Sequence, residues 1–417
     1  MSTSRGRRFI IDGSMNKAGG GFTYLVNIVP ELARQAPDDR FRILLSDQKL
    51  ANSIQPAPNV EIDYLGPLGL ADRFRFTYAE AARLARDWNT DLYFSASDWL
   101  PPNAECPTVV ALRNPNIFTL GKGQGLTGAQ RLRLRALNAV ARTSAATADR
   151  VMFVSEDSAG WIGDAIGAPE AKRAVVHHGI DSALWQAEPR RAAVHDRPYI
   201  LSVSSIYPYK NYVRLIEAYT EIARRNPELP DLVIVGDEQD AAASQAMWQA
   251  RDAAGEYSEW IHILGEVPYA DIRQYYRNAS LFVFPSYLET FGHPLLEAMA
   301  AEVPLVAADI PVFREVAGDA AFFADPLSTS SLARAMEDGL YRQGAAETLV
   351  KRGRERLQHF TWRRSASTLL ALFDDVLDED RHHGAPRAPA VHSLPGRRPR
   401  DSWSLPIAAR VAGALAH

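Results

Sequence analysis

The sequence has little cysteine, no long apolar run and no large excess of either charge. Its one cysteine, Cys106, excludes an internal disulfide and a cysteine-rich metal site. A formal net charge of −4 argues against a general nucleic-acid binder. No uncharged apolar run approaches the roughly 18 residues that a membrane-spanning helix needs, and no signal peptide is visible. We therefore expect a cytoplasmic protein that binds no nucleic acid.

The length of 417 residues and a hydrophobic content of 47% predict about two domains, each with its own core. Strand-like runs alternate with helical patterns, which indicates an α/β chain whose parallel sheets are covered by helices on both faces. We expect a first Rossmann-like domain over residues 1–183, a linker over 184–198 and a second Rossmann-like domain over 199–361. A helix follows at 362–380. The tail, 381–417, is rich in proline and arginine and is expected to be disordered.

The alternation also predicts where the individual elements lie. Strands are expected at residues 9–11, 41–45, 60–64, 91–94, 108–112, 150–154, 174–177, 199–205, 232–235, 261–264, 281–284 and 305–307. Helices are expected at 22–35, 73–88, 129–146 and 158–166 in the first domain. No set of spaced histidines or acids suggests a metal site.

The most informative stretch runs from residue 284 to 300, where an apolar strand ends and a helix begins. Pro294 suits the first turn of that helix, and Gly292 before it allows another segment to approach closely. A helix start presents unpaired N–H groups and favours an anion such as phosphate. Glu289 and Glu297 flank this anion site, so we expect them to accept hydrogen bonds from neutral hydroxyls. An anion between two groups of hydroxyls is what a nucleotide sugar presents, so this stretch predicts a site for such a ligand. The alternative is that the stretch is only a turn followed by an acidic helix start.

Two further features fit a phosphate ligand. Gly19, Gly20 and Gly21 form a glycine-rich loop ahead of the helix expected at 22–35, although plain loops also contain such runs. Lys210 follows the first strand of the second domain, where it can place a point charge on a pyrophosphate. The alternative for Lys210 is a solvated loop lysine.

Glu289 and Glu297, separated by Thr-Phe-Gly-His-Pro-Leu-Leu, resemble the glutamate-x7-glutamate motif of retaining glycosyltransferases of the GT-B fold, and family 4 is the nearest match. The resemblance runs through most of residues 8–378 and is strongest over 260–325. It implies two Rossmann-like domains facing each other across a cleft, with the last helix returning to the first domain. It also implies a retaining, metal-independent hexosyltransferase that uses a nucleoside diphosphate sugar as donor and needs no cofactor.

The resemblance assigns roles to particular residues. Glu297 is expected to hold the ribose hydroxyls and Glu289 the donor sugar, while Lys210 contacts the pyrophosphate. The expected catalytic residues are Glu289, Lys210 and Asn114. The expected donor-binding set is Gly20, Gly21, Ser205, Lys210, Glu289, Phe291, Gly292, His293, Pro294, Leu295 and Glu297, and the expected acceptor-binding set is Asn16, Asp98 and Arg113.

This chain departs from the family pattern at two places. Many relatives carry an arginine where this chain has Ser205, a hydrogen-bond donor without charge. Many also present a histidine after the strand at 108–112, where this chain has Arg113 and Asn114. Asn114 can hydrogen-bond a sugar hydroxyl and Arg113 can reach a phosphate, but neither can shuttle a proton near neutral pH as histidine does.

The expected setting is transfer to a saccharide or lipid-linked acceptor in cell-envelope polysaccharide assembly. A GT-B sugar-nucleotide epimerase would use the same residues without an acceptor, and a catalytically idle binding subunit is the alternative from another class. The helix at 129–146 carries Arg131, Arg133 and Arg135 beside apolar residues. Such a helix is compatible with peripheral contact with a membrane, and equally with a solvated basic face on a core helix.

Overall fold

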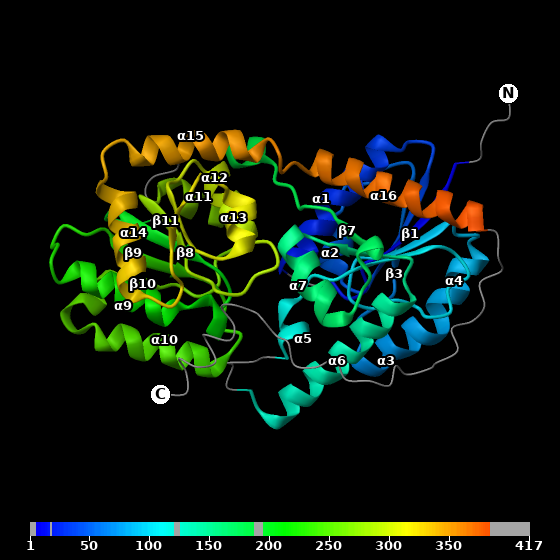
Figure 1. The fold of residues 1–417 in the computed structure, drawn as a ribbon, viewed down its shortest axis with the longest axis horizontal. Helices are drawn as coiled ribbons and strands as arrows, with labels where there is room; N and C mark the ends of the chain where they lie inside the picture. The colour runs from blue at the N-terminus through cyan, green and yellow to red at the C-terminus, as the bar shows by residue number, and fades with distance from the viewer. Residues whose placement is uncertain (1–5, 17–18, 121–125, 187–194, 384–417) are drawn as a thin grey trace. The chain divides into compact units, whose positions relative to one another are not determined.

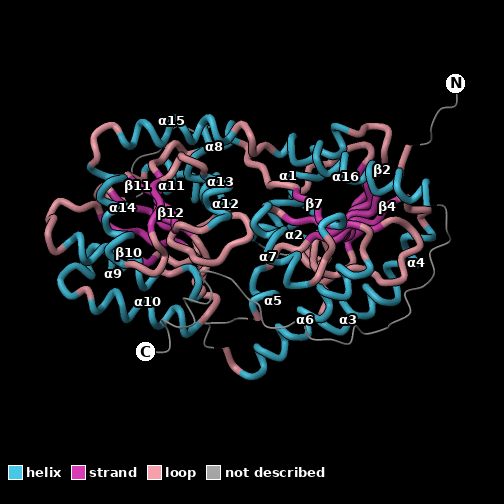
Figure 2. Tube along the Cα trace, viewed as in Figure 1, coloured by secondary structure: helices cyan, strands magenta, loops and turns pink. Residues whose placement is uncertain are grey.

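The computed structural model describes residues 6–16, 19–120, 126–186 and 195–383, which form two compact units (Figure 1). The first unit takes the described residues up to Leu120, residues 127–179 and residues 362–383. The second unit takes Leu126 and the described residues between Ile180 and Thr361. Each unit contains one parallel sheet between helices, as the strands in Figure 2 show.

The first unit contains a seven-stranded parallel sheet in the order β3-β2-β1-β4-β5-β6-β7. Alternate side chains of β1 enter two different cores, Phe9 and Ile11 on one face and Ile10 on the other. Both faces are therefore buried, as in parallel sheets covered by helices. The strand order reverses between β1 and β4, and ligands of such sheets bind beyond the carboxyl ends of strands at this point. The strands are β1 Arg8–Asp12, β2 Arg40–Leu45, β3 Val60–Tyr64, β4 Leu92–Ser95, β5 Thr108–Ala111, β6 Arg150–Phe153 and β7 Arg173–Val175.

The helices of the first unit follow the predicted alternation with two differences. The single helix expected at 73–88 is α3, a π-helical turn at Phe76–Glu80 and α4, because the π turn interrupts regular hydrogen bonding. The helix expected at 22–35 begins earlier, at Gly19, so the glycines are not a loop ahead of it. The helices are α1 Gly19–Gln35, α2 Gln48–Ser53, α3 Leu70–Arg75, α4 Ala81–Asp87, α5 Pro115–Thr119, α6 Gly128–Thr147, α7 Glu156–Ile166 and α16 Trp362–His383.

Helix α16 packs on the first unit although it follows the second unit in the chain. Its Phe373 stacks on Phe9 of β1, with ring centroids 5.2 Å apart, and Trp362 meets Tyr24 of α1 edge-on at 6.1 Å. The chain therefore returns to the first unit, as predicted. The helix continues to His383, so residues 381–383 are helical and not part of the expected tail; the rest of that tail lies outside the described residues.

The second unit contains a six-stranded parallel sheet in the order β10-β9-β8-β11-β12-β13. Its order reverses beside β8, whose neighbours are β9 and β11. The last strand, Phe322–Ala324, was not predicted, because a run of three residues carries no readable alternation. The strands are β8 Tyr199–Val203, β9 Asp231–Val235, β10 Ile261–Ile263, β11 Leu281–Phe284, β12 Leu305–Ala308 and β13 Phe322–Ala324.

Helices cover both faces of this second sheet. Part of the stretch predicted as a linker is helical: α8 places the buried Trp185 edge-on against Tyr276 of α11, at 5.3 Å between ring centroids. Residues 187–194 of that stretch lie outside the described residues. The α-helices are α8 Ser182–Gln186, α9 Tyr212–Ala223, α10 Ala241–Ala253, α11 Tyr269–Asn278, α12 His293–Ala300, α13 Pro311–Ala317, α14 Thr329–Tyr341 and α15 Ala345–Leu357, with 3-10 turns at Pro208–Lys210 and Gly255–Trp260.

Among the helices that the structure describes, none combines the length and the apolar character needed to cross a membrane.

The packing of α16 predicts the effect of one substitution. Phe373 is fully buried against β1 and β4, so Phe373→Ala should remove about 3–5 kcal/mol of stability from the first unit. Hydrogen-exchange mass spectrometry should show faster exchange in peptides of β1 and α1 than in those of the second unit. The neighbouring exposed Asp375→Ala is the control, and unchanged exchange of β1 in Phe373→Ala would contradict the assignment of α16 to this core.

Candidate functional site

Helix α12 follows β11 after a short loop. Gly292, the last residue of that loop, makes the start of the helix possible. The glycine has a φ of +94°, which other residues rarely adopt. A Cβ atom at this position would also lie 2.7 Å from Cε1 of Phe313. Pro294 lies in the first turn, as predicted, and Leu295 is buried. The sequence therefore produces a tight helix start, and helix starts of this kind favour an anion.

A nearly buried ion pair lies beside this helix start. Lys210 Nζ is 2.5 Å from Glu289 Oε1, and the two side chains are only 12% and 14% exposed. Lys210 Nζ also lies 5.2 Å from the ring centre of Tyr209 and 5.4 Å from that of Phe284. Because Lys210 follows β8 and Glu289 follows β11, two neighbouring strands bring the predicted catalytic pair together at their carboxyl ends.

Asn211 holds the loop that carries the lysine. Its φ is +65°, and its buried amide donates to the carbonyl oxygens of Pro285 and Pro326 at 3.1 and 2.9 Å. The Tyr287 amide in turn donates to the Tyr209 carbonyl at 3.0 Å. These bonds tie the loop after β8 to the loop after β11, which positions Lys210 against Glu289.

Glu297 lies further along α12 and has a partner that the sequence did not suggest. The Tyr276 hydroxyl donates a hydrogen bond to Glu297 Oε2 at 2.8 Å. Burial raises the pKa of Glu297 to about 7, although the bond from Tyr276 acts in the opposite direction. Tyr276 was missed because it comes from α11 and no local motif marks it.

The other predicted donor-binding residues of this unit include Phe291 and His293 at the same helix start, and Ser205 on the loop after β8. Burial lowers the pKa of His293 to about 4, so its imidazole is neutral at physiological pH. The His293 ring is 5.9 Å from that of Phe291, which is itself buried. Ser205 follows β8 and is partly buried. These residues add polar and aromatic surface without a net positive charge.

The predicted acceptor-binding residues meet in the first unit. Arg113 Nη2 donates to Asn16 Oδ1 at 3.0 Å and to the Ala96 carbonyl, and its guanidinium lies 4.7 Å from the ring centre of Tyr24. Burial raises the pKa of Asp98 to about 6, while the nearby Arg113 opposes that rise. Asn16, Asp98 and Arg113 therefore form one polar network beyond the carboxyl ends of β1, β4 and β5.

Gly21 and Asn114, both predicted to touch substrate, have structural roles that were not predicted. Gly20 and Gly21 lie in the first turn of α1, and a Cβ atom on Gly21 would lie 2.3 Å from Asn16 Oδ1. Gly21 therefore leaves room for the side chain that binds Arg113. Asn114 caps α5, because its Oδ1 accepts the Asn116 amide at 3.1 Å. A catalytic role for Asn114 stays a prediction.

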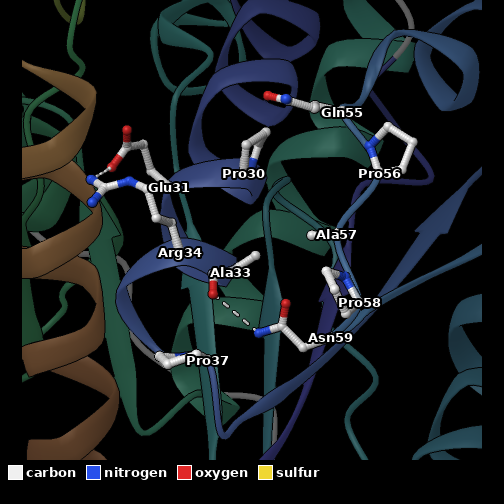
Figure 3. Close-up of a pocket in the computed structure, with 10 residues that line it drawn as sticks. All are labelled: Pro30, Glu31, Ala33, Arg34, Pro37, Gln55, Pro56, Ala57, Pro58 and Asn59. Carbon is white, nitrogen blue, oxygen red and sulfur yellow. Dashed lines mark hydrogen bonds and ion pairs between the residues drawn. The ribbon is translucent and has the colours of Figure 1, made fainter.

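A separate depression on the first unit contains none of the predicted site residues (Figure 3). It lies between the second half of α1, with Pro30 and Arg34, and the segment at residues 55–59. Asn59 donates its amide to the Ala33 carbonyl across this depression at 3.1 Å. Proline and alkyl surface predominate there, and we assign it no role.

Residues 185–356, nearly all of the second unit, match the family model described as Glycosyl transferases group 1. The solved structure of Alr3699/HepE from Anabaena in complex with UDP-glucose has a TM-score of 0.67 at 18% identity, covering 88% of this chain and 99% of that one. Sucrose-phosphate synthase of Thermosynechococcus elongatus also gives 0.67 at 18% identity, covering 89% and 100%.

The fold is GT-B.

The predicted fold class is thus confirmed, and relatives by sequence are glycosyltransferases. O-antigen chain mannosyltransferase B of Escherichia coli is 31% identical over 164 residues, 39% of this chain and 42% of that protein. D-inositol 3-phosphate glycosyltransferase of Kribbella flavida is 29% identical over 241 residues, 54% and 56% of the two chains. The chain spans about half the length of these curated relatives. The Lys210–Glu289 pair and the start of α12 lie within the part matched by the family model.

The raised pKa of Glu297 predicts a pH dependence of stability. A carboxyl group whose pKa rises from 4.5 to about 7 on folding stabilises the fold fully below pH 4.5 and loses that contribution as the pH rises through 7. Glu297→Gln keeps an acceptor for Tyr276 but cannot ionise. The stability of this variant relative to the wild type should therefore increase between pH 5 and 8, by up to about 3 kcal/mol. Urea unfolding at several pH values measures the difference, and a constant difference would contradict the buried, proton-linked Glu297.

Proposed function

We propose that this chain is a retaining glycosyltransferase of the family 4 type, which transfers a hexose from a nucleoside diphosphate sugar to a saccharide or lipid-linked acceptor. The observation that carries the proposal is the buried Lys210–Glu289 pair beside the start of α12. Glu289 stands on the loop that ends at Gly292, where α12 begins, and the whole stretch lies within the region matched by the glycosyltransferase model.

The ion pair suits a site that exchanges one anion for another. Without donor, the Glu289 carboxylate neutralises the Lys210 ammonium in a largely dehydrated position. A pyrophosphate arriving at the start of α12 gives Lys210 a new anionic partner, which releases Glu289 to accept hydrogen bonds from the donor sugar. The His293 amide at the start of α12 is proposed to donate to the same phosphate, whereas Pro294 has no N–H and the Leu295 amide donates to the Gly292 carbonyl at 3.0 Å.

Glu297 is proposed to bind the ribose hydroxyls of the donor. One of its oxygens accepts from Tyr276, so the other remains for a ribose hydroxyl. A carboxylate accepts this bond better than a neutral carboxyl group does, because the charge strengthens it. Since the pKa of Glu297 is about 7, donor binding should favour the ionised form.

Charge develops on the pyrophosphate as the bond to the sugar breaks, and Lys210 with the α12 amides stabilises it there. No other cation is required in this scheme, which is why we expect a metal-independent reaction. In a retaining transfer of this kind, the leaving phosphate accepts the proton of the acceptor hydroxyl. Arg113 and Asn114 then need only position groups and need not shuttle a proton.

The acceptor is placed on the first unit. Arg113 can bind a phosphate or a hydroxyl, and Asp98 and Asn16 can accept or donate bonds to sugar hydroxyls. Relatives named as O-antigen mannosyltransferases support a role in cell-envelope polysaccharide assembly. We expect the reaction in the cytoplasm or on the cytoplasmic face of the membrane. Neighbouring structures solved with UDP and UDP-glucose support a nucleotide sugar as donor.

The decisive experiment measures turnover of UDP- and GDP-sugars with saccharide acceptors. Lys210→Ala and Glu289→Ala should each lower the rate by about 10²–10³-fold, because each removes stabilisation of charge or position in the transition state. Lys351→Ala on the exposed face of α15 removes a lysine from the same unit and should leave the rate unchanged.

The same assay separates the alternatives. Isomerisation of the donor without an acceptor would indicate an epimerase, and donor binding without turnover would indicate an idle binding subunit. The anomeric configuration of the product, read by NMR, tests retention. Full activity in both Lys210→Ala and Glu289→Ala would contradict the proposed site.

A further inference from the structure

The second unit contains a cluster of metal-ligating side chains that the proposed reaction does not use. His195 Nε2 lies 2.8 Å and His262 Nε2 lies 3.1 Å from the same oxygen of Asp231, Oδ2. The two imidazole rings are 4.6 Å apart between centroids and inclined at 63°. Two imidazole nitrogens thus converge on one carboxylate oxygen, and this is the only such group of three or more ligands in the part of the chain that the structure describes.

The topology keeps this cluster away from the candidate donor site. Asp231 is the first residue of β9, His262 lies in the short strand β10 beside it, and His195 precedes β8. The cluster therefore lies at the amino-terminal edge of the sheet. Lys210 and Glu289 follow the carboxyl ends of β8 and β11, at the opposite edge of the same parallel sheet.

The geometry suits a small divalent metal ion. Ligand atoms around a tetrahedral zinc with bonds of about 2.0–2.1 Å are separated by roughly 3.3 Å. The observed separations of 2.8 and 3.1 Å differ from this by a few tenths of an ångström, and all three ligand atoms lie within 4.8 Å of one another. An ion entering between them would replace the two hydrogen bonds that now converge on Asp231 Oδ2.

The burial of Asp231 and the solvent access of the two histidines also suit a metal site. Asp231 is 5% exposed, whereas His195 and His262 are 22% and 32% exposed, so the carboxylate is dehydrated while the imidazoles reach solvent. Imidazole nitrogen together with a carboxylate is a ligand set for zinc and similar transition metals, and magnesium and calcium prefer oxygen ligands. A water molecule would complete four-coordination.

Arg197 orients the carboxylate from outside the cluster. Its Nη1 lies 2.9 Å from Asp231 Oδ1, the oxygen that does not face the histidines, and its guanidinium lies 5.1 Å from the ring centre of Trp260. A charged group paired with the outer oxygen of a ligating carboxylate helps to hold that carboxylate in place. The same positive charge repels a cation, which should keep the affinity moderate.

We propose that His195, Asp231 and His262 form a structural site for a divalent transition metal of the zinc type. The ion would link the segment before β8 to β9 and β10. It would therefore stabilise the amino-terminal edge of the second unit's sheet. It would take no part in sugar transfer, because it lies at the other edge of the sheet.

The test uses the full chain without a histidine tag, stripped of metal with a chelator and titrated with ZnCl2 by calorimetry. One equivalent should bind, and the melting temperature should rise with zinc and not with MgCl2. His195→Gln and His262→Gln should each weaken binding by about tenfold or more. His359→Gln, an exposed histidine of the same unit, is the matched control and should bind as the wild type does.

X-ray absorption on the zinc-loaded protein checks the ligands themselves. It should show nitrogen and oxygen neighbours at about 2.0–2.2 Å, with imidazole scattering that is reduced in His262→Gln. Absence of binding, or equal affinity in the double variant His195→Gln/His262→Gln, would overturn the proposal and leave a hydrogen-bonded cluster only. Circular dichroism of each variant without metal shows whether it is folded, and nucleotide-sugar turnover measured alongside reports on the proposed function separately.

Discussion

The candidate donor site is built around one nearly buried ion pair, formed by Lys210 and Glu289 at the carboxyl ends of two adjacent strands. Removing two charges from water is costly, and apolar replacements of such pairs are often neutral or stabilising. A contribution to the stability of the fold therefore does not explain why the chain keeps this pair. The surrounding bonds from Asn211 and Tyr287 hold the two loops in register, so the pair is kept in place at a position where a ligand can exchange for one partner.

The start of α12 is the second constraint, and it comes from sterics. Gly292 satisfies both a positive φ and the close approach of Phe313. The loop after β11, which carries Glu289, can therefore end in the start of α12. An analogous relation exists in the first unit, where Gly21 makes room for Asn16 and Asn16 binds Arg113. In each unit a glycine at a helix start makes possible a polar network at the carboxyl edge of a parallel sheet.

Much of the fold could be read from the sequence because period-two and continuous apolar runs mark buried parallel strands. The run at Leu281–Phe284 and the helix after it were predicted within a residue or two. The short strand Phe322–Ala324 and the π turn at Phe76–Glu80 were not, because neither leaves a periodic signal. The glycines at 19–21 were misplaced as a loop, since glycine is typical of loops and tolerated in a first helical turn.

The site was predictable where its residues are close in sequence and not where they come from distant elements. Glu289, Gly292 and Glu297 lie in one short motif, whereas Tyr276 reaches Glu297 from α11. The sequence analysis found no metal-ligand spacing for the same reason. His195, Asp231 and His262 come from three separate strand ends and meet only because the strand order places β8, β9 and β10 side by side.

The central claim is tested most directly by a crystal structure of the chain with a bound nucleoside diphosphate. The terminal phosphate is expected at the start of α12, within hydrogen-bonding distance of Lys210 Nζ and of the His293 amide, with Glu289 no longer paired to Lys210. A diphosphate bound elsewhere, with the Lys210–Glu289 pair intact, would contradict it.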